Sequence, residues 1–375
     1  MFKPFSNDEL NSCLQTADET TLPKLYSSIL DERYIPLSKQ NDVYYPTQRT
    51  KEWFAARAKV KSSITGSRPS GWYFDIKCGE TYKQHLSYVH LGVKQKFTPE
   101  AIKRMMYGTK FEDYAQKVFI EYMLQLNKNI YVYETGFQRN TEIPHLGSSP
   151  DGLISEWLSG IVIAERPSHQ YKGHKDYLVL YFDHENSIRT YVIHGKKRIE
   201  FALEKGKLLD DETKQKCKRL RAPPLPIGWQ KTSLEDSIVY GARFSVLEIK
   251  CPASKVYSSI PAYYLCQLMS EMATYNIDNC YFMCWHQKDG VERLRVWQLR
   301  FHEVFWKDFL KIVDLFRMKN SDGQRGISWV IFKEYWYQFK RKYGRVTAWK
   351  NHCKPMFEPR KYCIERPYSN KNMTS

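Results

Sequence analysis

The chain has 375 residues, and the 42% that are hydrophobic suffice for a core, which excludes a wholly disordered polypeptide. Its 58 Lys and Arg against 41 Asp and Glu give a net charge of +17, which favours a polyanionic partner, either nucleic acid or an anionic membrane surface. No apolar run approaches the roughly 18 residues of a membrane span, and residues 1–16 lack the apolar stretch of a signal peptide. We therefore expect neither membrane insertion nor secretion.

The cysteines give a second indication of the compartment. Nine cysteines are too few for a disulfide scaffold, so we expect a reducing environment, the cytoplasm or the nucleus. Cys280, Cys284 and His286 resemble part of a zinc site, but they lie in an apolar run that is typical of a buried strand. Because no fourth ligand is evident nearby, we predict that these cysteines belong to the core.

Residues 1–50 are expected to form an irregular or partly helical lead-in, because prolines interrupt it repeatedly. The first clear helix begins at Thr98, which can cap it, and Pro99, which suits the first helical position. Its predicted inward-facing side chains are Ile102, Met105 and Met106. Gly108 is expected to interrupt this helix, and a second helical pattern covers residues 111–126.

Two short strands, 130–133 and 136–139, precede a long stretch of different character. Residues 153–241 contain strand-like pieces at 177–182 and 190–194 and a charged run, and we expect them to form an insertion outside the main sheet. Its basic side chains fit DNA contact, although a solvated basic face, a partner surface or a lid are alternatives. These side chains are Lys196, Lys197, Arg198, Lys216, Lys218, Arg219 and Arg221.

The chain then returns to regular elements. A strand is predicted over 244–250 and a helix over 258–272. Two strands follow at 281–286 and 294–299, and the Asp289-Gly290 pair between them predicts a hairpin.

Residues 311–375 are expected to form a basic and aromatic helical extension. Rings beside cations are typical of single-strand binding, but an amphipathic helix that packs its rings on the core fits the pattern equally well. The rings are Tyr335, Trp336, Tyr337, Tyr343 and Trp349, and the cations are Lys340, Arg341, Lys342, Arg345 and Lys350.

Glu248 and Lys250 are the first candidates for chemistry. Because side chains alternate along a strand, both point to one face, while Leu247 and Ile249 point to the other. A carboxylate and an ammonium two residues apart near a strand end can together hold a divalent cation and a water. The alternative is a simple ion pair on an edge strand.

Three further polar residues lie where a metal site could use them. Asp151 sits between Pro150 and Gly152, a sequence typical of a turn, and a turn can carry an Asp beyond a strand end toward a metal. Glu112 lies on or beside the apolar face of its helix, where a carboxylate needs a partner, a metal or a boundary position. Gln267 can face the sheet, either as part of the site or as a satisfied core amide.

In the order helix Glu, turn Asp, strand Glu-x-Lys and helix Gln, the chain resembles the PD-(D/E)xK nuclease superfamily. Within it, the chain is most similar to the lambda-exonuclease-like group of YqaJ-type viral recombinases and herpesvirus-type alkaline nucleases. The resemblance covers residues 52–152 and 242–300. Its distinctive motifs are Ser149-Pro150-Asp151-Gly152 and Glu248-Ile249-Lys250-Cys251-Pro252, and its supporting motifs are Ile64-Thr65-Gly66-Ser67, Gly108-Thr109-Lys110-Phe111-Glu112 and Tyr264-Leu265-Cys266-Gln267.

The resemblance implies an α/β (α+β) fold with a restriction-endonuclease-like core, in which helices flank a central mixed sheet. This core would comprise residues 51–152 and 242–310, with the insertion at 153–241 between the two strands that carry metal ligands. The group's smaller phage enzymes join these strands by a tight turn, so the insertion leaves the geometry of the substrate open.

The resemblance also assigns roles to residues. Asp151 and Glu248, with the backbone carbonyl of Ile249, would bind Mg²⁺ or Mn²⁺, and Glu112 would help to hold the ion. Lys250 would orient or deprotonate the attacking water, a role for which a nearby metal favours the neutral amine. Gln267 would support this lysine or the water. The residues implied in phosphate binding are Arg57, Thr65 and Ser67.

The expected function is therefore metal-dependent hydrolysis of DNA, as a 5′-to-3′ exonuclease that acts on linear double-stranded DNA in recombination or DNA processing. A single-strand annealing protein is an expected partner. The alternatives are an endonuclease or RNase with the same site, and a non-catalytic nucleic-acid-binding protein on the nuclease fold. The relatives include trimers and monomers, so the oligomeric state stays open.

Overall fold

The structure is a computed structural model. It describes residues 32–40, 46, 48–59, 64–65, 78–90, 97–126, 128, 130–143, 146–169, 172–182, 188–220, 223–288, 291–317, 327–349, 351–356 and 363–365. These residues fall into two compact units. The core unit lies within Ser27–Ile120, Val132–Ile154 and Phe244–Ser375, and the insertion unit comprises Glu121–Tyr131 and Ser155–Arg243.

A mixed sheet runs through the core unit. The chain leaves the core unit along β6 and returns to it along β9. Its hydrogen-bonded order is β1 (Tyr34–Ile35), β3 (Ile130–Tyr133), β6 (Gly152–Pro167), β9 (Ile238–Lys250), β10 (Asn279–Lys288), β11 (Val291–Arg300) and β12 (Cys353–Pro355), with β13 (Cys363–Glu365) also paired to β11. Strand β1 is parallel to β3 and β9 to β10, whereas β10 and β11 are antiparallel, with Lys288 opposite Val291. The central mixed sheet and the hairpin are thus confirmed.

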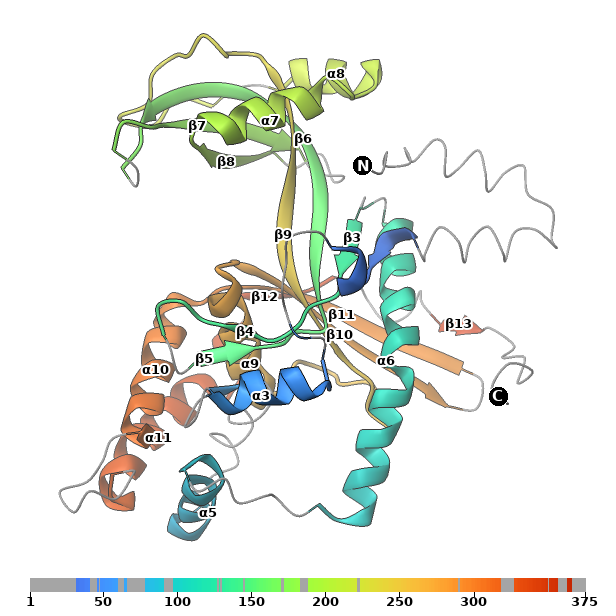
Figure 1. The fold of residues 1–375 in the computed structure, drawn as a ribbon, viewed down its shortest axis with the longest axis vertical. Coiled ribbons are helices and arrows are strands. Elements are labelled where there is room, and N and C mark those ends of the chain that lie inside the picture. The colour runs from blue at the N-terminus through green and yellow to red at the C-terminus, as the bar shows by residue number, and fades with distance from the viewer. Residues whose placement is uncertain are drawn as a thin grey trace. The chain divides into compact units, whose positions relative to one another are not determined.

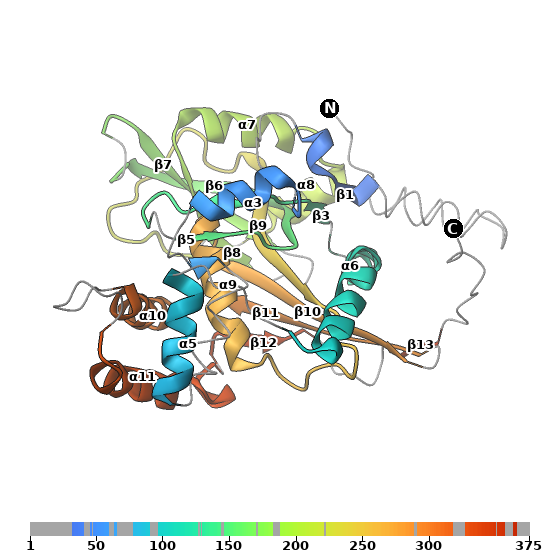
Figure 2. The ribbon, with the colours of Figure 1, turned by 60° about the horizontal axis from the view of Figure 1, so that its bottom comes forward.

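Helices flank both faces of this sheet (Figure 1, Figure 2). They are α3 (Lys51–Lys59), α5 (Gly79–His90), α6 (Pro99–Gln125), α9 (Ala262–Tyr275), α10 (Glu303–Arg317) and α11 (Trp329–Tyr343), with the 3-10 helices η1 (Leu37–Lys39) and η2 (Val346–Trp349). Side chains alternate along β10, so successive residues contact helices on opposite faces of the sheet. Tyr281 and Trp285 contact Phe119 and Phe111 of α6, with ring centroids 5.9 and 5.2 Å apart, whereas Phe282 joins the apolar cluster of α9, α10 and α11.

A second sheet of the core unit leads into the turn that contains Asp151. Its order is β2 (Ile64–Thr65), β5 (Leu146–Ser148) and β4 (Gln138–Arg139), with β2 and β5 parallel and β4 and β5 antiparallel. The predicted strand at 130–133 is confirmed as β3, and that at 136–139 is confirmed only for its last two residues.

Helix α6 corrects two predictions. Thr98 Oγ1 accepts a hydrogen bond from Ala101 N at 3.2 Å, as expected for the start, but the helix continues through Gly108 to Gln125. A glycine costs only about 1 kcal/mol relative to alanine in a helix, which the packing of a long helix can offset. The predicted inward-facing residues are also exposed, because residues 102–106 are exposed on every side of the helix and its buried residues begin only at Ala115. Their exposed fractions are 46% for Ile102, 53% for Met105 and 66% for Met106.

The insertion unit is built on the outer part of β6. Its other elements are β7 (Lys175–Phe182), β8 (Ile188–His194), α7 (Lys196–Gly206) and α8 (Asp211–Lys218), so the charged run is mostly helical. Strand β7 pairs with residues 159–167 of β6, which belong to the insertion itself, and β8 pairs with β7, so the position of the insertion outside the main sheet stays a prediction. Alternation along β7 places Val179 in a cluster with α7 and Leu180 in a cluster with α8.

Helix α11 decides between the two interpretations of the aromatic C-terminal stretch. Trp336, Tyr343 and Trp349 are buried in the core-unit cluster, which confirms the amphipathic helix for these rings. Tyr335 and Tyr337 stay 49% and 48% exposed. Cys280 and Cys284 are buried in β10, as predicted, and His286 Nδ1 contacts the Pro252 carbonyl at 2.9 Å. In the part of the chain that the structure describes, no helix has the length and apolarity needed to cross a membrane.

Candidate active site

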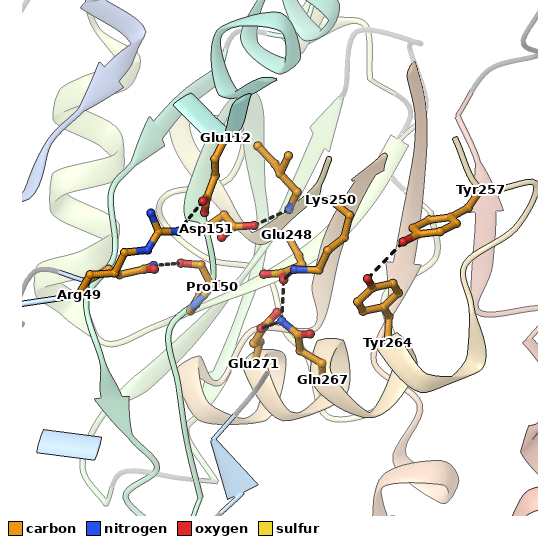
Figure 3. A network of polar contacts seen from close by, with 12 residues as sticks. Arg49, Glu112, Pro150, Asp151, Glu248, Lys250, Tyr257, Tyr264, Gln267 and Glu271 are labelled. Atoms are coloured by element: carbon orange, nitrogen blue, oxygen red, sulfur yellow. Dashed lines mark hydrogen bonds and ion pairs between the residues drawn. The ribbon is translucent and has the colours of Figure 1, made fainter. Parts of the chain in front are cut away.

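The end of β9 brings Glu248 and Lys250 to the sheet face that α9 covers (Figure 3). In the parallel pairing with β10, Glu248 lies opposite Phe282 and Lys250 opposite Cys284, and both partners belong to the cluster that contains α9. Lys250 Nζ donates a hydrogen bond to Glu248 Oε1. The prediction that the two side chains share one face is therefore confirmed.

Asp151 is fixed against the next strand by its own side chain and by its backbone. Its Oδ2 atom accepts a hydrogen bond from Ile249 N at 2.6 Å, and its carbonyl accepts one from Gln116 Nε2 of α6 at 3.0 Å. A Cβ on Gly152 would lie 2.9 Å from Val132 Cγ1, which explains why glycine follows the aspartate. The turn thus carries the carboxyl group to the end of β9, 97 residues along the sequence from Glu248.

The residues before Asp151 are held by the segment that leads into α3. The Pro150 carbonyl accepts hydrogen bonds from Gln48 Nε2, at 3.0 Å, and from Thr135 Oγ1. Trp53 Nε1 donates to Ser149 Oγ at 2.9 Å. These contacts from different elements restrict the conformation of the turn, so the direction of the Asp151 side chain is set by the fold rather than by local sequence alone.

Glu112 approaches the same point from α6 (Figure 3). Its Oε2 atom lies 2.7 Å from Arg49 Nη2, and its side chain is 23% exposed. Its charge also raises the pKa of Asp151, which indicates that the two carboxyl groups are neighbours. A helix, a turn and a strand therefore bring the carboxyl groups of Glu112, Asp151 and Glu248 together, as the order of the motifs predicts.

Electrostatics distinguish Asp151 from an ordinary surface acid. Burial raises the pKa of Asp151 well above its usual range, and the charges of Glu248 and Glu112 raise it further, against the opposing effect of Lys250. The negative form of this carboxyl group is thus disfavoured by its surroundings. A positive charge placed between the carboxyl groups would remove that cost.

Lys250 is the main cation within the site. Burial alone would lower its pKa, but Glu248 and Asp151 raise the pKa of Lys250 well above its usual value. Its Nζ atom also lies 5.4 Å from the ring of Tyr264, whose hydroxyl lies 3.3 Å from that of Tyr257. In these surroundings Lys250 is an ammonium that balances part of the carboxylate charge.

Gln267 and Glu271 extend the hydrogen-bond network of the site onto α9. Gln267 Nε2 donates to Glu248 Oε1 at 2.5 Å and to Glu271 Oε1 at 2.8 Å, so the amide contacts the carboxylate that Lys250 also binds. Burial and the charge of Glu248 raise the pKa of Glu271 well above its usual range. Glu271 is fully buried, and the amide of Gln267 bridges it to Glu248.

The donor atoms fit a hard divalent cation. Carboxylate oxygens are the ligands that Mg²⁺ and Mn²⁺ prefer, and such an ion would offset the burial and the neighbouring negative charges that raise the pKa of Asp151. Within the described ranges, however, no group of three or more His, Cys, Asp or Glu side chains is arranged to hold a metal ion. The oxygens are held instead by Ile249 N–H, Lys250 and Arg49, with which an ion would compete.

The structure describes two of the three predicted phosphate-binding residues. Arg57 lies in α3, with its guanidinium carbon 4.1 Å from the centroid of the Trp53 ring. Thr65 ends the short strand β2, which pairs with the β5 strand of the Asp151 turn. Ser67 lies outside the described residues.

Several residues of the site were missed in the sequence. Glu271 carried a usable signal, because it follows Gln267 by four positions and must therefore lie on the same face of the helix. Gln48 and Gln116 bind backbone carbonyls of the Asp151 turn, and Arg49 binds Glu112 across 63 residues of sequence. No local pattern indicates these three contacts, since each depends on how distant segments pack.

Comparison with known proteins identifies a family that matches this chain. The family model described as "YqaJ-like viral recombinase domain" matches residues 52–278. Two solved structures of an alkaline exonuclease from Laribacter hongkongensis, one of them in complex with dAMP, are similar to the chain at 14% identity, with TM-scores of 0.35 and 0.34. Each alignment covers 78% of this chain and 97% of the other. No curated protein matches the sequence.

Proposed function

Because the chain belongs to the YqaJ-like viral recombinase domain family, and through it to the lambda-exonuclease-like group of PD-(D/E)xK nucleases, we propose that it is a divalent-metal-dependent DNA nuclease. The favoured form is a 5′-to-3′ exonuclease that degrades linear double-stranded DNA during recombination or DNA processing. The observation that carries the proposal is the convergence of Glu112, Asp151 and Glu248 beside Lys250. A protein that only binds nucleic acid gains nothing from gathering carboxylates where a phosphate must approach.

In this proposal Asp151 and Glu248 hold the ion together with the carbonyl of Ile249, and Glu112 assists. When bound, Mg²⁺ or Mn²⁺ lowers the pKa of a coordinated water and stabilises negative charge on the phosphoryl group. Lys250 Nζ orients the attacking water and can accept its proton. A cation at the same carboxylates opposes the effect that raises the pKa of Lys250, which favours the neutral amine that a base requires.

The remaining assignments concern positioning. Gln267 is proposed to hold Glu248 in place through its 2.5 Å hydrogen bond, and Glu271 to hold the amide of Gln267. Arg57, Thr65 and Ser67 are proposed to bind phosphate, and the stacking of Arg57 on Trp53 supports a fixed direction for its guanidinium.

The insertion is proposed to contact DNA or a partner, for example a single-strand annealing protein. Its exposed cations on α7 and α8 support an electrostatic contact with phosphates. Several of them are also paired locally, such as Lys216 with Glu212 at 2.9 Å, so part of this charge is already balanced. Arg221, the last of the predicted cations, lies outside the described residues.

One assay tests the proposed function. The purified protein is incubated with linear duplex DNA bearing 5′-phosphate or 5′-hydroxyl ends, with circular duplex DNA and with RNA, each with Mg²⁺ or with chelator. We expect Mg²⁺-dependent digestion of linear DNA with a preference for the 5′-phosphate end, and a loss of about 10³-fold in rate for Glu248→Gln. Glu303→Gln, which removes an exposed carboxylate of α10, is the matched control and should cut as wild type.

The other outcomes are equally specific. Cleavage of circular DNA or of RNA would replace the exonuclease with an endonuclease or RNase that uses the same site. Binding without a divalent ion, combined with no cleavage of any substrate, would leave a non-catalytic nucleic-acid-binding protein. Full activity in Glu248→Gln would refute the assignment of the site.

A further inference from the structure

Arg49 has an unusual backbone conformation for its residue type. Its φ of 68° lies in the left-handed region, which side chains other than glycine adopt only at a cost. Both neighbouring residues are held by hydrogen bonds. Gln48 Nε2 is bound to the Pro150 carbonyl at 3.0 Å, and Thr50 Oγ1 accepts from Trp53 N at 3.2 Å at the start of α3. Arg49 therefore lies between a residue bound to the Asp151 turn and a residue bound to α3.

The side chain of Arg49 turns toward the carboxyl cluster (Figure 3). Arg49 Nη2 lies 2.7 Å from Glu112 Oε2, and the arginine side chain is 54% exposed. A guanidinium carries five N–H donors in a planar fork, and this bond uses one end of it. Arg49 thus presents a permanent positive charge at the solvent side of Glu112.

Fold stability does not account for an arginine at this position. An ion pair with this much exposure contributes little, because water and salt screen it. The left-handed backbone opposes that small gain, and glycine would avoid the strain. Strained residues of this kind concentrate at functional sites, where the surrounding structure holds them.

We propose that Arg49 is a phosphate-binding residue of this site, whose guanidinium keeps Glu112 oriented and binds a non-bridging oxygen of the DNA phosphodiester. The inference rests on the proposed nuclease function and names a residue of its substrate site. A phosphodiester that reaches Asp151 and Glu248 approaches three carboxyl groups, whose charge Lys250 offsets only in part. Arg49 adds a second cation beside Glu112, with the geometry that suits phosphate.

The test uses Arg49→Gly, which removes the side chain while permitting the left-handed backbone. We expect an unchanged or higher melting temperature. DNA affinity measured with Ca²⁺ should fall about tenfold, as expected for one charge-assisted contact. The KM for DNA should rise by about the same factor with a smaller change in kcat. The slope of log affinity against log salt should become shallower by about 0.9, the contribution of one phosphate.

Two further variants make the test specific. Arg49→Lys keeps the charge but not the fork, so it should restore part of the affinity and the full salt slope. Lys51→Ala removes an exposed positive charge two residues away and should leave affinity and slope unchanged.

The outcomes distinguish a failure of the proposed role of Arg49 from a failure of the proposed nuclease function. Wild-type affinity and salt slope in Arg49→Gly would overturn the role of Arg49, as would an equal loss in Lys51→Ala. A lower melting temperature with an unchanged salt slope would make Arg49 structural and also overturn the role. Failure of the wild-type protein to cut any DNA would instead refute the proposed nuclease.

Discussion

Buried carboxyl groups occur in both units of the protein, but their surroundings differ. In the insertion unit, Asp176 accepts hydrogen bonds from Arg166 Nε and Nη2, both at 3.3 Å, and contacts His194 Nδ1 at 2.8 Å. Burial alone would raise its pKa, but the contacts with His194 and Ser168 hold the pKa of Asp176 below its usual value. The charged form of this carboxylate is thus stabilised by the fold itself.

The core unit shows the opposite pattern. Burial and neighbouring carboxylates raise the pKa of Asp151 and of Glu271, and Lys250 opposes them only in part. Carboxylates that a protein balances internally serve its stability, whereas carboxylates left in mutual repulsion are suited to receive a cation. The contrast supports the proposal that the acidic cluster of the core unit is the functional one.

The largest expected effect is on activity, for Asp151→Asn. The amide still accepts the hydrogen bond from Ile249 N but loses the charge that would hold a metal, so we expect a loss of about 10³-fold in cleavage rate. Because the raised pKa means that the folded state disfavours the ionised form, the neutral residue should leave the free energy of unfolding at pH 7 unchanged or higher. Activity assays and urea denaturation measure the two effects. Strong destabilisation by this variant would contradict the contrast between the units.

Glu156→Gln in the insertion unit is expected to lower stability and to leave activity intact, the reverse of Asp151→Asn. Glu156 is 2% exposed and pairs with Lys128 at 3.4 Å and with Arg243. Removing its charge leaves buried cations less compensated, which should lower the free energy of unfolding by about 3 kcal/mol. Nuclease activity below the unfolding temperature should persist. Glu235→Gln, at an exposed pair with Lys231, is the control and should change stability by less than about 0.5 kcal/mol.

The sequence predicted the elements whose signals are local. Alternation sufficed to place Glu248 and Lys250 on one face, and the Asp289-Gly290 pair sufficed for the hairpin of β10 and β11. The motifs, read through a family resemblance, also brought Glu112 and Asp151 to the same strand end. Each of these predictions needs only the geometry of one element or a known order of motifs.

The predictions that failed needed information about packing. Gly108 breaks a helix only if nothing else stabilises it, and α6 continues through it. The apolar spacing of Met105 and Met106 indicated a face but not whether another element covers it. Arg49 was missed for a related reason, since it follows Gln48, whose contact with a turn 102 residues away no local pattern indicates.

The smallest expected effect concerns pH. Asp176 is 1% exposed and binds Arg166 and His194, so Asp176→Asn should lower the free energy of unfolding at pH 7 by about 2 kcal/mol, the contribution of hydrogen bonds to a charged group. Because the folded pKa of Asp176 is lowered, its contribution is complete above the unfolded value of about 3.9 and is lost as the pH falls through the folded one. The difference between wild type and Asp176→Asn should therefore be present at pH 5 and shrink below pH 4. Urea denaturation across this range measures it, with Asp236→Asn as the exposed control. A difference that grew below pH 4 would mean that the folded state raises the pKa of Asp176, and the distinction between the two carboxylate clusters would be lost.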